Sequence, residues 1–152
     1  METKLPFVTL KYAQTIDGRI ASATGHSQWI SSKASRRFAH ALRAEHDAVL
    51  VGVDTVIRDD PELTVRLARG QNPVRIIVDS TLRIPEDATI VQNQKKATTL
   101  IAVTPQSSEK RRAYFNERGI ETLVIDEDGK GRVDLNKLLI ALGEKGLSSV
   151  LV

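Results

Sequence analysis

Residues 48–53, Ala-Val-Leu-Val-Gly-Val, form a short and continuous apolar run that leads directly into a polar stretch. A run of this kind is typical of a strand that is buried on both faces of a sheet. Residues 75–79 (Arg-Ile-Ile-Val-Asp) and 98–103 (Thr-Thr-Leu-Ile-Ala-Val) have the same character. Because helices must cover both faces of a sheet built from such strands, these runs predict an α/β fold with a largely parallel sheet.

The remaining pattern continues this alternation of strands and helices. Alternating or short apolar patterns predict further strands at 5–13, 122–125 and 148–152. Apolar residues at helical spacing predict helices at 33–45, 109–118 and 135–142. Ser31, Ser32 and Asp134 stand where N-caps are expected, because a short side-chain oxygen satisfies the first free amides of a helix.

Composition restricts the chemistry that this chain can carry. The 152 residues include 22 Lys and Arg, 19 Asp and Glu and no Cys, which leaves a net charge of +3. Without cysteine, these residues hold no disulfide, no thiolate nucleophile and no cysteine-ligated metal centre. The three histidines, His26, His40 and His46, lack the spacing of metal ligands, so we expect no metal site.

Partners and location are predicted from the distribution of basic and apolar residues. The basic residues are spread along the chain without an aromatic-containing cluster, which argues against nucleic-acid binding. No apolar segment has the length of a membrane span or of a signal-peptide core. We therefore expect a cytoplasmic protein that binds neither nucleic acid nor membranes, in which single arginines bind the phosphate groups of a small ligand.

Polar side chains gather where α/β folds place their sites, at the carboxyl ends of strands. After the strand predicted at 48–53, the chain supplies the hydroxyl of Thr55, the carboxylate of Asp59 and the guanidinium of Arg66. Ser80 follows another buried strand. Each of these residues alone also fits an ordinary turn or a solvent-exposed position. Together they predict a polar site beside the sheet.

Four ordered motifs in the first half of the chain are similar to one family. They are residues 8–21 (Val-Thr-Leu-Lys-Tyr-Ala-Gln-Thr-Ile-Asp-Gly-Arg-Ile-Ala), 25–30 (Gly-His-Ser-Gln-Trp-Ile), 42–44 (Leu-Arg-Ala) and 59–66 (Asp-Asp-Pro-Glu-Leu-Thr-Val-Arg). In this combination they resemble the pyrimidine reductase of riboflavin biosynthesis, which in many bacteria is the C-terminal reductase domain of a bifunctional deaminase-reductase. The resemblance extends from about Phe7 to the last residue.

The resemblance implies both a fold and an activity. The implied fold is a dihydrofolate-reductase-like three-layer α/β/α sandwich with a mostly parallel central sheet. The implied reaction is the reduction of 5-amino-6-(5-phosphoribosylamino)uracil by NADPH to the ribitylamino product. The ribosylamine of this substrate can open to an imine, which accepts the hydride of the nicotinamide.

The resemblance also implies roles for individual residues. The positions that match cofactor contacts are Ala13, Trp29, Thr55, Asp59 and Ser80. The positions that match substrate contacts are Ser27, Arg43, Leu63 and Arg66. Lys11 and Asp59 match polar residues beside the reacting centre, and we assign them as the candidate catalytic residues. Arg75 and Arg83 lie close enough in sequence to meet the 2′-phosphate of NADPH.

The family pattern differs from this sequence at both ends. A zinc deaminase domain needs cysteine ligands, which these residues lack. The family also continues after residues 149–152 with a glutamate-containing glycine turn and further strands. We therefore expect residues 1–152 to be the N-terminal part of a reductase domain whose C-terminal strands are missing. In this hypothesis Val150, Leu151 and Val152 form a strand buried inside the sheet, an exposed sheet edge promotes association, and the complete enzyme is a homodimer.

Two other functions remain open from the sequence. One is a related NADPH-dependent reductase that acts on another pyrimidine- or pterin-like substrate. The other is a non-catalytic nucleotide-binding module that retains the fold. NADPH titration separates the non-catalytic module from the two enzymes, and substrate turnover separates the enzymes from each other.

Overall fold

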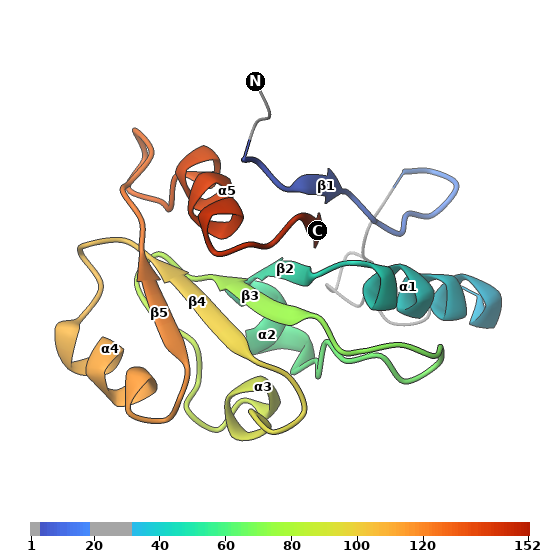
Figure 1. Ribbon diagram of the computed structural model, residues 1–152, viewed down its shortest axis with the longest axis horizontal. Coiled ribbons are helices and arrows are strands. Elements are labelled where there is room, and N and C mark those ends of the chain that lie inside the picture. Colours follow the sequence, from blue (N-terminus) through green and yellow to red (C-terminus); the bar gives the residue numbers. More distant parts are fainter. Residues whose placement is uncertain (1–3, 19–31) are drawn as a thin grey trace.

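The computed structural model describes residues 4–18 and 32–152, and these form alternating strands and helices (Figure 1). The strands are β1 (Phe7–Thr9), β2 (Ala48–Gly52), β3 (Val74–Val78), β4 (Thr99–Val103), β5 (Glu121–Val124) and β6 (Ser149–Leu151). The helices are α1 (Lys33–Glu45), α2 (Val53–Asp59), α3 (Thr89–Gln92), α4 (Glu109–Asn116) and α5 (Leu135–Glu144).

The six described strands form one sheet in the order β1-β6-β2-β3-β4-β5. Every neighbouring pair in this sheet is parallel, with Ala48 opposite Val74 and Arg75 opposite Thr99. The prediction of a parallel sheet is therefore confirmed. Because all strands point the same way, their carboxyl ends meet at one edge of the sheet, where the loops that follow them converge.

Helices cover both faces of the sheet, as the sequence predicts. One core cluster joins the sheet to Val53 and Val56 of α2, Ile90 of α3 and Phe115 of α4. The other joins the opposite face to Leu138 and Leu142 of α5. Figure 1 shows this arrangement, with α5 on one side of the sheet and α2, α3 and α4 on the other. The predicted three-layer α/β/α arrangement is confirmed.

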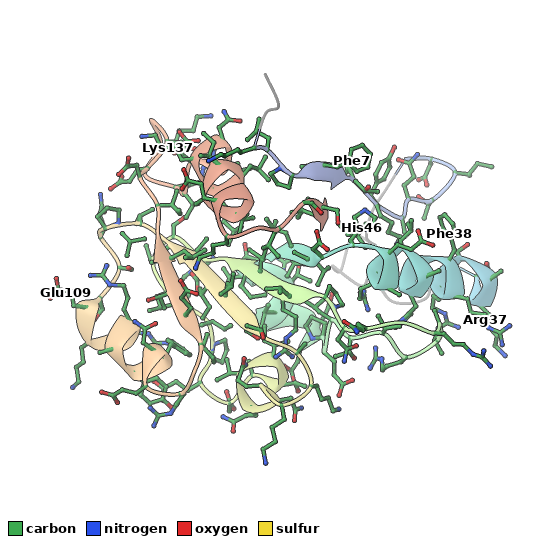
Figure 2. All side chains as sticks on the ribbon, viewed as in Figure 1. Phe7, Arg37, Phe38, His46, Glu109 and Lys137 are labelled. Atoms are coloured by element: carbon green, nitrogen blue, oxygen red, sulfur yellow. The ribbon has the colours of Figure 1, made fainter. Side chains whose placement is uncertain are left out.

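The first helix is packed differently from the others. Of the α1 side chains, only that of His40 is buried, and Phe38 is 65% exposed. The helix begins at the N-cap Ser32, whose hydroxyl oxygen accepts a hydrogen bond from the Ser35 amide at 3.1 Å. At its other end the Nε2 atom of His46 lies 2.7 Å from the Thr9 hydroxyl, which links α1 to β1 (Figure 2). The helix thus contacts the sheet mainly through its C-terminal end.

Several boundaries differ from the predicted ones. The strand predicted at 5–13 is limited to Phe7–Thr9, and Val53 begins α2 instead of ending β2. The helix expected at 109–118 ends at Asn116. The short helices α2 and α3 were not predicted, because four to seven residues are too few to show a helical period. The N-cap role of Asp134 is confirmed by hydrogen bonds from the amides of residues 136 and 137 to its carboxylate.

The last strand lies inside the sheet. β6 pairs with β1 on one side and with β2 on the other, and Val150 and Leu151 are buried. Val152 follows β6 and exchanges backbone hydrogen bonds with Thr9 and Lys11. The prediction of a buried strand at 150–152 is confirmed for its first two residues. β1 forms an edge of the described sheet and exposes Phe7, and association through this edge remains a prediction.

Candidate functional site

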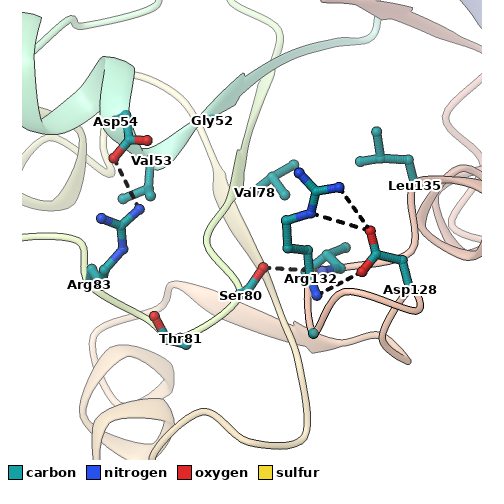
Figure 3. A pocket seen from close by; sticks show the side chains of 12 residues that line it. Gly52, Val53, Asp54, Val78, Ser80, Thr81, Arg83, Asp128, Arg132 and Leu135 are labelled. Atoms are coloured by element: carbon teal, nitrogen blue, oxygen red, sulfur yellow. Dashed lines mark hydrogen bonds and ion pairs between the residues drawn. The ribbon is translucent and has the colours of Figure 1, made fainter.

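A pocket of about 490 Å³ opens at the carboxyl ends of β2 and β3 (Figure 3). Three segments line it: 52–54 at the junction of β2 and α2, 78–83 after β3, and 128–135 before α5. Its walls combine the hydroxyls of Ser80 and Thr81 with the guanidinium groups of Arg83 and Arg132. The open end of parallel strands is where α/β folds bind nucleotides, and this pocket has that position.

Ser80, a predicted cofactor contact, joins the loop after β3 to the pocket residue Val133 and to Thr104, which follows β4 outside the pocket. Its side-chain oxygen accepts a hydrogen bond from the Val133 amide at 3.1 Å, and its carbonyl oxygen accepts one from the Thr104 hydroxyl at 2.8 Å. The preceding Asp79 is buried and turns inward, where its carboxylate accepts a hydrogen bond from the Ile84 amide at 2.8 Å. Asp79 therefore shapes the loop, whereas Ser80 lines the pocket.

Both arginines of the pocket form ion pairs with neighbouring carboxylates. The Arg83 guanidinium lies 3.0 Å from the Asp54 carboxylate, and that of Arg132 lies 3.3 Å from the Asp128 carboxylate (Figure 3). Backbone hydrogen bonds from Arg132 and Lys130 lower the pKa of Asp128 and keep it ionised. All four paired side chains except that of Asp128 are more than half exposed, so a phosphate group can reach the cations.

Helix α2 connects this pocket to a second group of predicted site residues. It begins beside the pocket at Val53 and ends at Asp59, a length of about 10 Å for seven residues. Thr55 and Asp59 are four residues apart and so lie on the same side of the helix. Asp60 then ends the helix in the left-handed conformation, and its carboxylate accepts hydrogen bonds from the Thr89 amide and hydroxyl at 2.7 and 2.6 Å.

Three predicted substrate contacts, Arg43, Leu63 and Arg66, are brought together where the loop after α2 packs against α1. The Arg43 guanidinium donates a hydrogen bond to the Thr64 carbonyl at 2.9 Å. Leu63 is buried and has a φ of 53°, a left-handed conformation that is uncommon for leucine and holds this turn in a fixed shape. Residues 43 and 66 are thus neighbours only because this loop folds back onto α1.

An acidic residue that the sequence analysis did not single out, Glu62, organises the charges of this loop. Its carboxylate lies 3.1 Å from the Arg66 guanidinium and 2.6 Å from the Lys96 ammonium. The hydrogen bond from Lys96 is the main reason why the pKa of Glu62 is lowered. Arg66 remains 57% exposed, so its guanidinium has donors left for a ligand.

Arg75 does not have the role that the sequence suggested. Its side chain is completely buried, and its guanidinium donates hydrogen bonds to the carbonyls of Glu62, Asn93 and Ala97 at 3.4, 3.2 and 2.5 Å. It therefore cannot meet a cofactor phosphate, and that expectation is wrong. Arg75 lies on the same covered face of β3 as Ile77, where its side chain holds three loop carbonyls, while Arg83 stays in the pocket.

The remaining predicted residues are placed only in part. Lys11 is exposed just after β1, and its amide donates a hydrogen bond to the Val152 carbonyl at 2.8 Å. Ala13 is partly buried. Ser27 and Trp29 lie outside the described residues. Within the described ranges, no hydrogen bond or ion pair joins Lys11 to Asp59, the two candidate catalytic residues.

Two features of this site were not predicted from the sequence. The loop at 128–132 lines the pocket, although its glycines and charges read only as a polar connection. His40 also contacts the loop after α2, because its Nδ1 atom accepts a hydrogen bond from the Arg66 amide at 3.0 Å. In the sequence, His40 falls outside the apolar spacing of Phe38, Ala41 and Leu42, so the pattern of this helix predicted a polar face for it, whereas the structure buries His40 and exposes Phe38.

The part of the chain that the structure describes shows neither a metal-binding cluster nor a membrane-spanning helix. Residues 4–18 and 32–152 contain no group of three or more histidine and acidic side chains that could hold a metal ion. None of the helices in this part of the chain is long and apolar enough to cross a membrane.

Comparison with known families gives a match over nearly the whole chain. The model of the RibD C-terminal domain matches residues 6–152. The riboflavin biosynthesis protein RibD of Actinobacillus pleuropneumoniae is 41% identical over 152 residues, which cover 100% of this chain and 40% of that protein. The chain therefore spans well under half the length of this relative.

Two further proteins show the same similarity with different extents. The 2,5-diamino-6-ribosylamino-4(3H)-pyrimidinone 5′-phosphate reductase of Methanothermobacter thermautotrophicus is 41% identical over 150 residues, which cover 97% of this chain and 66% of that protein. A crystal structure of the diaminohydroxyphosphoribosylaminopyrimidine deaminase/5-amino-6-(5-phosphoribosylamino)uracil reductase of Thermotoga maritima superposes with a TM-score of 0.78 at 35% identity, over 98% of this chain and 39% of that one. Such neighbours have the dihydrofolate-reductase-like fold that the resemblance implied.

Proposed function

Because the chain belongs to the RibD C-terminal domain family, we propose that it reduces 5-amino-6-(5-phosphoribosylamino)uracil to the ribitylamino product with NADPH. The observation that carries this proposal is the convergence of Arg43 and Arg66 on one loop, joined by α2 to a pocket at the carboxyl ends of β2 and β3. This arrangement offers one place for a dinucleotide and another for a phosphorylated substrate.

The pocket has the chemistry that a phosphate-rich dinucleotide requires. Ser80 and Thr81 supply hydroxyl groups, and Arg83 and Arg132 supply planar cationic donors that suit phosphate oxygens. A side chain at Gly52 would meet no atom within 4 Å, so the floor of the pocket is open at this point. When bound, NADPH supplies the hydride. Ser80, Thr55 and Asp59 would hold it, and Arg83 would favour its 2′-phosphate over the hydroxyl of NADH.

The substrate phosphate is assigned to the arginines beside α1. Arg43 is fixed by its hydrogen bond to the Thr64 carbonyl, whereas Arg66 is exposed and free to move within its ion pair with Glu62. The fixed arginine would orient the phosphate, and the exposed one would close on it. Leu63 would pack against the substrate between the two cations. Ser27 is proposed as a further contact from the resemblance.

The reaction also needs a proton for the imine nitrogen. Lys11 is proposed as one source, since its exposed ammonium follows β1, which lies in the sheet next to the strand β6. Asp59 is proposed as the other, because it ends the helix that joins the two parts of the site. Ala13 and Trp29 complete the proposed cofactor contacts. Cytoplasmic location and a homodimer remain predictions.

Turnover of the substrate by the chain tests the proposal directly. The full-length protein is mixed with NADPH and 5-amino-6-(5-phosphoribosylamino)uracil, and both NADPH oxidation and the ribitylamino product are measured. Replacing Arg66 with Ala removes a charge-assisted contact of about 1.5–3 kcal/mol and should raise KM for the substrate about tenfold or more, without changing NADPH affinity. Replacing Arg69, an exposed arginine of the same loop, with Ala is the matched control and should leave both constants unchanged.

Two results would contradict the proposal. If the full-length protein binds NADPH but oxidises it equally slowly with and without the substrate, this substrate is wrong. If Arg66→Ala weakens NADPH binding and leaves substrate binding intact, the assignment of the two halves of the site is reversed.

A further inference from the structure

His40 lies where α1 meets the loop after α2 that carries Arg66, and it has no role in the proposed reaction so far described. Its side chain is only 8% exposed. Its Nδ1 atom accepts a hydrogen bond from the Arg66 amide at 3.0 Å. A ring nitrogen that accepts a hydrogen bond carries no proton, so this contact requires the neutral imidazole with its proton on Nε2. The backbone of Arg66 is therefore held by one particular protonation state of His40.

The charges around this imidazole all oppose its protonation. Arg43 comes from the next turn of α1, and Arg66 comes from the loop packed against it. Burial, followed by the Arg43 and Arg66 charges, lowers the pKa of His40, and a backbone hydrogen bond with Thr64 acts in the opposite direction. The nearest acidic group of the loop, Glu62, is already paired with Arg66. A proton on Nδ1 would add a third positive charge and remove the acceptor of the Arg66 amide.

We propose that His40 is a positioning residue that holds the Arg66 backbone so that the guanidinium groups of Arg66 and Arg43 face one phosphate monoester. The inference rests on the proposed function, since it concerns the phosphate of that substrate. Neutral His40 fixes the backbone of the loop at Arg66. Thr64 lies two residues earlier in the same loop, and its carbonyl fixes the side chain of Arg43 from α1. When His40 is protonated, the Arg66 amide loses its acceptor and the two cations no longer share one geometry.

This role predicts a pH dependence for one ligand only. Substrate affinity should fall as the pH drops through the pKa of His40, because the protonated ring releases Arg66. NADPH affinity should not follow, since the pocket at the carboxyl ends of β2 and β3 does not include this loop. The phosphate group of the substrate also titrates, with a pKa of about 6. The experiment must therefore separate the titration of the ligand from that of the protein.

Two variants of His40 make this separation. His40→Asn places an amide oxygen near the position of Nδ1, so it keeps an acceptor for the Arg66 amide and does not titrate. His40→Leu introduces an apolar side chain of similar size and removes the hydrogen-bond acceptor. Dissociation constants for the substrate and for NADPH are measured by calorimetry between pH 8 and a pH below the His40 pKa, which the titration of the ring signals gives. Thermal unfolding of each variant at both ends of this range reports whether it is folded.

The expected results differ among the three proteins. At pH 8, His40→Asn should bind the substrate nearly as well as the wild type, and His40→Leu about tenfold more weakly, which corresponds to one lost hydrogen bond. At low pH the wild type should lose more affinity than His40→Asn, whose remaining pH dependence comes from the phosphate alone. NADPH affinity should stay the same in all three. Equal substrate affinity of His40→Leu and wild type at pH 8, or identical pH profiles for wild type and His40→Asn, would overturn the positioning role.

Nuclear magnetic resonance gives a readout that does not depend on either ligand. The ¹⁵N shifts of the His40 ring should show the Nε2-protonated tautomer at pH 8, and the Arg66 amide signal should titrate together with that ring. An Nδ1-protonated neutral ring, or an Arg66 amide that does not respond, contradicts the inference. If the wild type binds NADPH but no substrate while this titration is present, the proposed function fails instead, and the substrate role of His40 fails with it.

Discussion

Replacing Arg75 tests how the loop that carries Glu62 and Arg66 is held in place. The guanidinium is completely buried and joins three segments through the carbonyls of Glu62, Asn93 and Ala97. Burial lowers the pKa of Arg75, and the Glu62 charge acts in the opposite direction. We expect Arg75→Ala to destabilise the whole fold rather than to change cofactor preference, because no part of this side chain reaches the pocket at the carboxyl ends of the strands.

The size of the effect can be estimated from these contacts. Two of the acceptors, at 2.5 and 3.2 Å, are well within hydrogen-bond range, and the third at 3.4 Å is weak. A fully buried carbonyl that loses its donor costs about 1–3 kcal/mol, and these part-buried ones cost less, but truncation also leaves a cavity. Part of this loss is offset because the guanidinium no longer has to be desolvated. The net loss should be about 3 kcal/mol for Arg75→Ala and about 1–2 kcal/mol less for Arg75→Met, which refills the space.

Urea unfolding followed by circular dichroism measures these losses. Arg83→Ala serves as the control, since Arg83 is 54% exposed and pairs with an Asp54 side chain that is 68% exposed. Such a pair contributes little, so this variant should lose less than about 0.5 kcal/mol. The reasoning is refuted if Arg75→Ala loses less than about 1 kcal/mol, or if it loses no more than Arg83→Ala. Either result would mean that water or other donors satisfy the three carbonyls.

Two further substitutions test contacts between segments that are distant in sequence: Asp47 with residues 148–149, and Gly143 with Lys4. Asp47 accepts hydrogen bonds from the amides and hydroxyls of Ser148 and Ser149, which lower its pKa below 3.8, so Asp47→Ala should lose about 1–2 kcal/mol in urea unfolding at pH 7. This stabilisation is present above the pKa of Asp47 in the unfolded chain and disappears as the pH falls through the lower pKa of the folded state. The stability difference between Asp47→Ala and wild type should therefore shrink below pH 3.8, and a constant difference would contradict the assignment. Replacing a helical glycine with alanine normally stabilises the helix by about 1 kcal/mol. At Gly143 the new Cβ would overlap the Lys4 carbonyl, so the melting temperature of Gly143→Ala should fall. A rise in melting temperature would show that residues 4–6 do not pack on α5.

The sequence contains enough local pattern to predict the layers of this fold. The apolar runs at 48–53, 75–79 and 98–103 indicate strands with both faces covered, and the structure places all three side by side in the centre of the sheet. Burial on both faces favours apolar side chains, so the inner positions of such a strand form a nearly continuous apolar run in the sequence. The same reasoning identified Val150 and Leu151 as an internal strand. The short helices α2 and α3 had no such signal, because a helix of one or two turns shows no period.

The candidate site could be predicted only in part, because residue types do not reveal which charges are buried. Arg75 lies near the start of β3 and Arg83 follows this strand, and both were equally plausible phosphate contacts in the sequence. In the structure Arg75 is enclosed by three carbonyls, whereas Arg83 lines a pocket. Arg43 and Arg66 matched one family motif set, but their common loop and the role of Glu62 come from the fold. Local periodicity reports how deeply an element is buried, whereas the partner of a side chain depends on where the sheet order brings distant segments. The contact between His40 and the Arg66 amide, which are 26 residues apart, is therefore decided by the tertiary structure alone.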